Sequence, residues 1–197
     1  MRPLPFSWPY ALVFWAAYIW AFSPEWNVVR GGMQGVKRAD SKDSGSLGVL
    51  LAGMWIALLG AFFLAFVRAL SFPQQLQLPL FAIGVTLILL GSLLRRYCWR
   101  TLGEYFTGDV RATADQPVIS TGPYRLVRHP SYTAGIMMFA GIGLALGSWA
   151  SFVLVTVAAI ATYLYRVTVE EKALLATIGE PYNAYIKDRK RFIPYIV

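Results

Sequence analysis

Residues 149–178 read WASFVLVTVAAIATYLYRVTVEEKALLATI. Glycine and proline do not interrupt this run before Gly179 and Pro181, so the sequence predicts one continuous helix from Trp149 to about Ile178. A helix of this length extends for about 45 Å, whereas the hydrocarbon core of a bilayer is about 30 Å thick. We therefore expect the helix to cross a membrane over about 149–166 and its last turns to project into water.

The composition of the whole chain agrees with a membrane location. Of its 197 residues, 57% are hydrophobic and only 14% are charged, which is typical of an integral membrane protein. The sequence predicts a single all-α domain, a bundle of about five transmembrane helices. The expected spans lie at about 8–23, 47–70, 78–94, 132–146 and 149–166.

Two further features of this layout are expected from the sequence. The third span ends abruptly at Arg95-Arg96. The polar, glycine-containing stretch from Glu25 to Ser46 is expected to be a connecting loop.

The net charge is +8, and the positions of the basic residues indicate how the chain is oriented in the membrane. The basic residues form no continuous run and no nucleic-acid motif, so a nucleic-acid partner is not expected. With five spans, sixteen of the eighteen Lys and Arg residues fall on one side, and only Arg2 and Arg68 fall on the other. By the positive-inside rule the crowded side is cytoplasmic. A short chain of this kind suggests a bacterial-type inner membrane.

A disulfide and a metal site are both unexpected. Cys98 is the single cysteine, and no Cys/His spacing suited to zinc or iron is present. We expect Cys98 to be buried. We expect no metal partner.

The stretch Gly122 to Tyr132, which reads GPYRLVRHPSY, holds the only histidine, His129. So many hydrogen-bonding groups beside a membrane-length apolar run are costly unless a ligand or a specific fold uses them. The stretch therefore predicts the wall of an active site. In simpler interpretations, Pro130 starts a helix while His129 satisfies nearby backbone groups, and Tyr124 and Tyr132 are interfacial anchors.

Arg166 and Glu170 lie four residues apart, on one face of the last helix. Glu171 is turned about 100° away, so one glutamate can face the site while the other faces water or lysines. The simpler interpretation is a surface ion pair at a helix end. Ionisable groups near a membrane are often functional, so a functional site that includes Arg166 and Glu170 remains the alternative interpretation.

Together these residues resemble the isoprenylcysteine carboxyl methyltransferase family, over roughly Leu94 to Pro194, which is half of the chain. Their order and spacing carry the resemblance. The matching elements are Leu102-Gly103 with Tyr105-Phe106, Gly122-Pro123-Tyr124, Arg128-His129-Pro130-Ser131-Tyr132, Glu170-Glu171, and Gly179-Glu180-Pro181-Tyr182 with Tyr185.

The resemblance implies a methyltransferase that binds S-adenosylmethionine in a cytoplasm-facing pocket built from about 95–132 and 166–197. It implies catalytic roles for Arg166 and Glu170, and contact with the substrate through Arg166. It also implies that the cofactor is contacted by Gln116, Pro117, Val118, Ile119, Tyr124, His129, Pro130, Ser131, Tyr132 and Glu170.

The chemistry of methyl transfer fits this implication. Transfer from a sulfonium is an in-line displacement, so the protein must align donor and acceptor and exclude water. A carboxylate acceptor is already ionised at neutral pH and needs no general base, and Arg166 suits it. We expect an amphiphilic, isoprenylcysteine-like or other lipid-like substrate that enters from the bilayer, with membrane lipids as the other partners.

Three alternatives stay open. One is a phospholipid or other small-lipid N- or O-methyltransferase. If its acceptor is an amine, this alternative predicts an essential base such as Glu170 or His129 and a rate that rises with pH. An NADPH-dependent sterol-type reductase usually has more spans than this chain supplies. A non-enzymatic membrane scaffold that binds anionic lipid explains the charge distribution but not the cluster of His129, Tyr124, Tyr132, Arg166 and Glu170.

Overall fold

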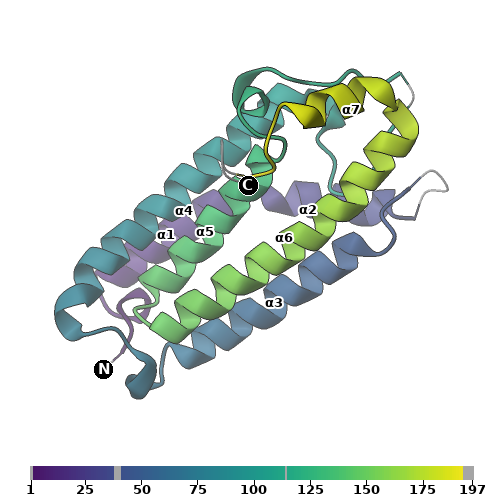
Figure 1. Ribbon diagram of the computed structural model, residues 1–197. Helices are drawn as coiled ribbons and strands as arrows, with labels where there is room; N and C mark the ends of the chain where they lie inside the picture. The colour runs from purple at the N-terminus through teal and green to yellow at the C-terminus, as the bar shows by residue number, and fades with distance from the viewer. Residues whose placement is uncertain (1, 38–40, 114, 193–197) are drawn as a thin grey trace.

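The computed structural model describes residues 2–37, 41–113 and 115–192. These residues form helices and connecting segments, with no strand among them (Figure 1). Short 3-10 helices lie at Leu4–Phe6, Arg68–Leu70, Gly103–Tyr105 and Gly122–Arg125. The α-helices are α1 (Tyr10–Phe22), α2 (Glu25–Gly35), α3 (Ser46–Leu64), α4 (Gln74–Leu102), α5 (Pro130–Ala145), α6 (Trp149–Ile178) and α7 (Glu180–Lys187).

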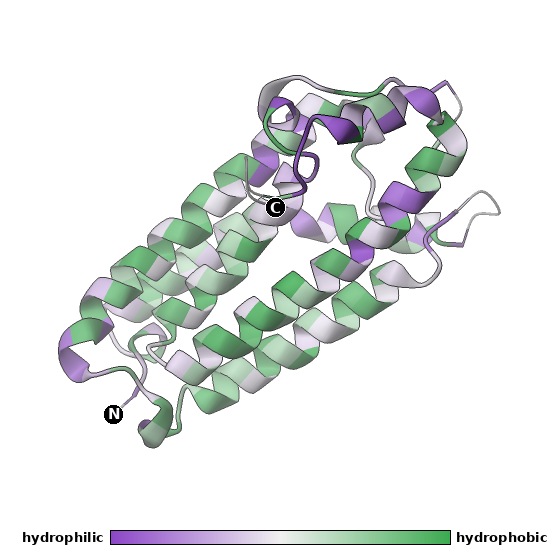
Figure 2. Ribbon diagram, viewed as in Figure 1, coloured by the Kyte–Doolittle hydropathy of each residue, from purple (hydrophilic) through white to green (hydrophobic). Residues whose placement is uncertain are grey.

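The predicted all-α membrane bundle is confirmed. Within the described residues, three helices are long and apolar enough to cross a membrane, namely Ser46–Leu64, Gln74–Tyr105 and Trp149–Ile178. The expected spans at about 8–23 and 132–146 correspond to shorter helices, α1 and α5, which pack in the same bundle. Hydrophobic residues run along these helices and hydrophilic residues gather at one end, near α7 (Figure 2).

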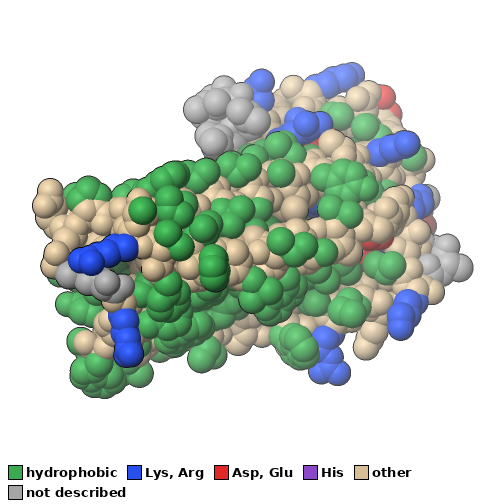
Figure 3. All heavy atoms as spheres, turned by 90° about the horizontal axis from the view of Figure 1, so that it is seen from below, with side chains coloured by type: hydrophobic (Ala, Val, Ile, Leu, Met, Phe, Trp, Pro, Cys, Tyr) green, Lys and Arg blue, Asp and Glu red, His purple; other side chains and the backbone are tan. Residues whose placement is uncertain are grey.

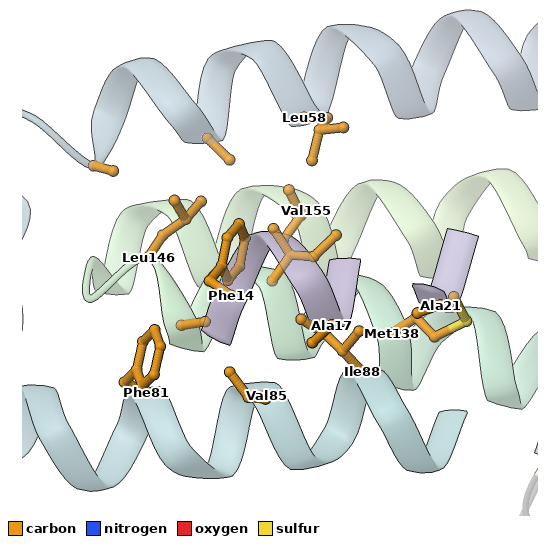
Figure 4. Packing of buried hydrophobic residues seen from close by; sticks show 14 of the residues in the cluster. Phe14, Ala17, Ala21, Leu58, Phe81, Val85, Ile88, Met138, Leu146 and Val155 are labelled. Atoms are coloured by element: carbon orange, nitrogen blue, oxygen red, sulfur yellow. The ribbon is translucent and has the colours of Figure 1, made fainter. Parts of the chain in front are cut away.

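The bundle is held together by an apolar core to which α1, α3, α4, α5 and α6 all contribute (Figure 4). Phe14, Ile88, Met138 and Val155 are all at most 1% exposed there. Packing between α4 and α5 is close because glycines meet: a Cβ added at Gly84 would lie 2.5 Å from the carbonyl oxygen of Gly141. This agrees with the close helix packing that small residues permit in lipid.

One expectation about the polar connections is wrong. Residues 25–35 form helix α2 and not a loop, because Gly32 packs against the backbone of Gly108 and its missing side chain makes room for that contact. The helix that contains the expected third span, α4, continues beyond Arg95-Arg96 to Leu102. Neighbouring helices satisfy both arginines: Arg95 pairs with Glu25, and Arg96 donates to the Trp20 carbonyl oxygen at 2.7 Å.

The polar end of the bundle brings distant segments together. Helix α7, the segment after α4 and helix α2 all lie at this end (Figure 1). The lysine and arginine side chains gather toward the two ends of the molecule, with a broad hydrophobic surface between them (Figure 3). The last residues of the expected cofactor-binding segment, 193–197, lie outside the described residues. Cys98 is fully buried, as expected.

Candidate active site

A cavity of about 770 Å³ lies at the polar end of the bundle and extends toward its middle. Its volume is in the range of small-molecule sites. Polar groups line one part, including Gln116, His129, Tyr132, Arg166 and Glu170. Apolar side chains from α1, α3 and α5 line the other part, among them Phe22, Leu50, Met54, Leu58, Met138 and Phe139. One space therefore joins a polar compartment to an apolar one.

The structure brings nearly all the predicted cofactor contacts to this cavity. Gln116, Pro117, Val118 and Ile119 line it from the segment between α4 and α5. Tyr124 lines it from the 3-10 helix Gly122–Arg125, His129, Ser131 and Tyr132 line it from the start of α5, and Glu170 lines it from α6. Pro130 does not line the cavity; it is the first residue of α5, where its fixed φ suits a helix start.

Glu170 and Tyr132 form a direct polar contact in the cavity wall. The Tyr132 hydroxyl donates to Glu170 Oε2 at 2.5 Å. The Tyr132 ring stacks on His129, with centroids 5.5 Å apart, and on Tyr163, with centroids 4.9 Å apart. The stack fixes the tyrosine ring, so its hydroxyl holds the Glu170 carboxylate in one orientation. The Glu170 side chain remains 30% exposed and is therefore accessible to a ligand.

Glu171 has a different role, which the sequence left open. Its Oε1 accepts from Arg128 Nη1 at 2.7 Å and lies 3.1 Å from His129 Nε2. Its Oε2 accepts from Arg191 Nη2 at 2.8 Å. Only 8% of the side chain is exposed. Glu171 thus joins α6 to the start of α5 and to the carboxyl-terminal segment, and it faces neither water nor lysines.

The carboxyl-terminal segment is fastened beside the cavity by backbone bonds. The Arg128 amide donates to the Lys190 carbonyl oxygen at 2.8 Å, and the His129 amide donates to the Arg191 carbonyl oxygen at 2.9 Å. The Thr133 hydroxyl donates to the Phe192 carbonyl oxygen at 2.8 Å. The segment therefore holds the residues around His129 in place.

Arg166 lines the cavity, but it already has a carboxylate partner. Its Nη1 forms an ion pair with Asp43 and also donates to Ser46 Oγ at 2.6 Å, while Nη2 donates to the Gly108 carbonyl oxygen at 2.7 Å. Asp43 lies in the stretch that was expected to be only a connecting loop. Sequence alone offered no signal for this pair, because 123 residues separate its members.

The environment of Asp43 keeps it ionised. Burial alone would raise the pKa of this carboxyl group, but three neighbours outweigh burial and hold the pKa below its usual range. They are the Leu47 amide, which donates at 2.9 Å, the positive charge of Arg166 and the Ser46 hydroxyl, which donates at 3.0 Å.

A second ion pair, between Arg95 and Glu25, lines the same cavity. Arg95 Nη2 donates to Glu25 Oε2 at 2.8 Å, and Arg95 Nη1 donates to Ser131 Oγ at 2.7 Å. The pair joins α2, α4 and α5. It was missed because Arg95 was interpreted as the end of a span and Glu25 as the start of a loop.

The tyrosines at the polar end outside the spans remain neutral. Burial raises the pKa of Tyr124 and of Tyr182, and it raises the pKa of Tyr185 to about 12. Tyr124 and Tyr182 are at most 6% exposed. The three side chains therefore serve as aromatic surface and neutral hydrogen-bonding groups at pH 7.

These residues fit a ligand with a sulfonium and an amino group. Glu170 offers an accessible carboxylate to a cation, and the rings of Tyr124, Tyr132 and Tyr182 line the cavity where a cation can lie against them. No group of three or more metal-ligating side chains occurs in the described part of the chain.

Comparison with known proteins identifies the family. The model of the phospholipid methyltransferase family matches residues 80–180. The chain belongs to this family. The matched region contains α5, all of α6 and the segment from Gln116 to Ile119, and therefore most of the polar wall of the cavity.

The named relatives agree with the resemblance seen in the sequence. The protein-S-isoprenylcysteine O-methyltransferase of Schizosaccharomyces pombe is 30% identical over 155 residues, which are 75% of this chain and 66% of the relative. A probable protein-S-isoprenylcysteine O-methyltransferase of Oryza sativa subsp. indica is 26% identical over 66% of this chain and 69% of the relative. Protein-S-isoprenylcysteine O-methyltransferase B of Arabidopsis thaliana is 27% identical over 57% of this chain and 58% of the relative.

The chain thus spans about three fifths to two thirds of the length of these relatives. The predicted membership of the isoprenylcysteine carboxyl methyltransferase family is confirmed. The roles of the individual site residues stay predictions.

Proposed function

We propose that this protein moves a methyl group from S-adenosylmethionine to the carboxylate of an amphiphilic, isoprenylcysteine-like or other lipid-like acceptor. The observation that carries the proposal is the single cavity in which Glu170, Tyr132 and His129 share one space with the apolar side chains of α1, α3 and α5. A polar donor and a lipid acceptor need such a joint compartment. The names of the relatives support the carboxylate as acceptor.

The donor belongs at the polar wall. When bound, S-adenosylmethionine supplies an electrophilic methyl group on a positively charged sulfur. The residues from Gln116 to Ile119, with Tyr124, His129, Ser131 and Tyr132, would hold it, and the Glu170 carboxylate would bind its cationic part. The aromatic rings favour a positive charge over their faces. Because Tyr132 fixes Glu170, the carboxylate is oriented before any ligand arrives.

The acceptor belongs between Arg166 and the apolar compartment. Its tail would lie against Leu50, Met54, Leu58 and Phe139, and its carboxylate would meet the guanidinium of Arg166. A carboxylate is ionised at neutral pH, so no residue must remove a proton. The work left to the protein is alignment and the exclusion of water. The apolar compartment contributes to both.

The reaction would take place at the cytoplasmic face of a membrane, in a bacterial-type inner membrane. The distribution of lysine and arginine along the chain supports this orientation. A cysteine placed at exposed Asp188 should react with an impermeant maleimide only from the cytoplasmic side, for example in inverted vesicles.

A second candidate acceptor is a lipid amine, which the ion pair of Arg166 with Asp43 favours. A free arginine beside the acceptor would repel a cationic amine, and Asp43 removes that objection by balancing the charge. An amine must lose a proton before it attacks, so Glu170 or His129 would be needed as a base. The rate would then rise with pH through the pKa of that base, whereas transfer to a carboxylate would not require a base.

Binding of S-adenosylhomocysteine tests the proposal most directly. We expect calorimetry on the detergent-purified protein to detect binding of S-adenosylhomocysteine and no binding of NADPH. We also expect Glu170→Ala to weaken binding at least tenfold, since a charge-assisted contact is lost, where about tenfold corresponds to one such contact. Glu180→Ala is the matched control, because Glu180 is an exposed acid at the start of α7. Binding of NADPH alone would refute the proposal.

The acceptor class is tested with labelled S-adenosylmethionine and two probes, N-acetyl-S-farnesylcysteine and an ethanolamine phospholipid. Transfer to the first should yield a methyl ester that releases methanol in alkali. Base-stable label on the phospholipid would instead establish the amine acceptor.

A further inference from the structure

Asp43 is among the most enclosed charged groups of the protein, although it precedes the first long apolar helix and lies outside the stretch that the family model matches. It is 1% exposed. Its Oδ1 accepts from the Ser46 hydroxyl at 3.0 Å and from the Val110 amide at 3.3 Å, and its Oδ2 accepts from the Leu47 amide at 2.9 Å. These bonds fix the carboxylate before its pairing with Arg166 is considered.

Arg166 is held from one side by this arrangement. Its Nη1 donates to Asp43 and Ser46, and its Nη2 donates to the Gly108 carbonyl oxygen. A guanidinium has five N–H groups, and these bonds use three of them. Tyr132 and Glu170, on the cavity side, also interact electrostatically with Arg166. The arginine therefore lies between a fixed internal carboxylate and the cavity.

We propose that Asp43 is a positioning residue that holds Arg166 at the cavity wall and, by balancing its charge, limits how strongly Arg166 binds an anionic acceptor. This inference rests on the proposed function. The family resemblance places the site in the second half of the chain, whereas here the residue that sets the charge of its arginine comes from the segment between α2 and α3.

The physical argument concerns competition for one guanidinium. An acceptor carboxylate approaching Arg166 shares its positive charge with Asp43, so attraction to the acceptor is weaker than attraction to an unpaired arginine. Weak binding of the acceptor carboxylate by Arg166 favours a high kcat. A carboxylate bound very tightly by arginine would be a poorer nucleophile, and binding that is equal in the ground state and the transition state does not raise kcat.

Asp43→Asn separates this role from a merely structural one. Asparagine keeps the shape and an acceptor oxygen for Arg166 but removes the charge. We expect the KM for N-acetyl-S-farnesylcysteine to fall by about tenfold, the equivalent of one charge-assisted hydrogen bond. The KM for S-adenosylmethionine should not change. The inhibition constant of the uncharged carboxamide of the same probe should also not change, because only a negative charge senses Asp43.

Two matched variants complete the test. Asp188→Asn removes an exposed acid at the end of α7 and should alter neither KM. Ser46→Ala removes the second partner of Nη1 while the ion pair remains, and it should lower the acceptor KM in the same direction by about threefold, because an uncharged hydroxyl competes for the guanidinium less strongly than a carboxylate does. The serine variant keeps the inference falsifiable if Asp43→Asn does not fold.

The outcomes separate this inference from the proposed function. An unchanged or raised acceptor KM in a variant that still binds S-adenosylhomocysteine would overturn the role of Asp43 and leave the methyltransferase proposal intact. A fall in kcat alone, with both KM values unchanged, would mean that Asp43 is only structural. Absence of S-adenosylhomocysteine binding in the wild type would overturn both.

Discussion

The adjacent glutamates Glu170 and Glu171 should respond in opposite ways to the same change of carboxylate to amide. Glu171 is 8% exposed and receives bonds from Arg128, His129 and Arg191. Glu170 is 30% exposed and receives one bond, from Tyr132. We therefore expect Glu171→Gln to lower stability with a secondary effect on ligand binding, and Glu170→Gln to weaken ligand binding with little effect on stability.

The size of the effect follows from the partners of Glu171. Arg191 is 38% exposed, so its bond contributes little. Arg128 and His129 are 14% and 5% exposed, and glutamine would leave the buried guanidinium without a counter-charge. Removing one partner of a buried charged pair costs about 3 kcal/mol. Glu170→Gln removes a charge that receives one hydroxyl bond and lies 4.0 Å from His129 Nδ1 at a partly exposed site, a change of less than about 1 kcal/mol in stability.

The assay is equilibrium unfolding in mixed micelles of dodecyl maltoside and dodecyl sulfate, with calorimetric binding of S-adenosylhomocysteine to each folded variant. The two glutamates are neighbours on one helix, so helix propensity is matched. A loss below about 0.5 kcal/mol for Glu171→Gln, the range of ordinary surface changes, would refute the assignment of Glu171 as the buried joint of the fold. A loss of stability for Glu170→Gln that exceeds the loss for Glu171→Gln would also refute this assignment.

Three further predictions concern single groups. Tyr132→Phe should weaken S-adenosylhomocysteine binding by about tenfold in calorimetry, because Glu170 loses the bond that orients it. Gly84→Ala should lower stability by about 2 kcal/mol in mixed-micelle unfolding, since a Cβ would lie 2.5 Å from the Gly141 carbonyl oxygen; Gly48→Ala, which meets nothing within 4 Å, is its control and should not destabilise. Because the pKa of Asp43 is lowered from 3.8, its contribution to stability is complete above about pH 4 and is lost as the pH falls through the lower, folded pKa; thermal unfolding from pH 6 to 2 should show a steeper fall for wild type than for Asp43→Asn.

The parts of the fold that local sequence governs could be predicted. Helix α6 begins at Trp149 and ends at Ile178, as expected, because Gly179 is the first residue that breaks the run. Small residues permit close packing of helices, and Gly141 of α5 does meet α4. The polar wall of the cavity could also be predicted, because the stretch from Gly122 to Tyr132 places many polar groups beside an apolar run.

The parts that depend on tertiary contacts could not be predicted. Helix α2 contains three glycines, which by propensity favour a loop. Its Gly32 is helical in the fold because Gly108 packs against it from a segment far along the chain. The ion pair of Asp43 with Arg166 has the same character. The role of Asp43 becomes visible only when folding brings Arg166, which lies more than a hundred positions later in the sequence, beside it.

The length of helix α6 indicates how deep Arg166 lies relative to the membrane. From Trp149, at the end of the bundle away from α7, to Arg166 it rises by about 25 Å, at 1.5 Å per residue. This distance is close to the thickness of the hydrocarbon layer, so with Trp149 at one membrane surface we expect Arg166 to lie near the level where lipid head groups meet the acyl chains. A lipid acceptor anchored in the bilayer would carry its head group at that level. In the function proposed above, it would not have to be lifted out of the membrane to react, and no free energy would be needed for extraction.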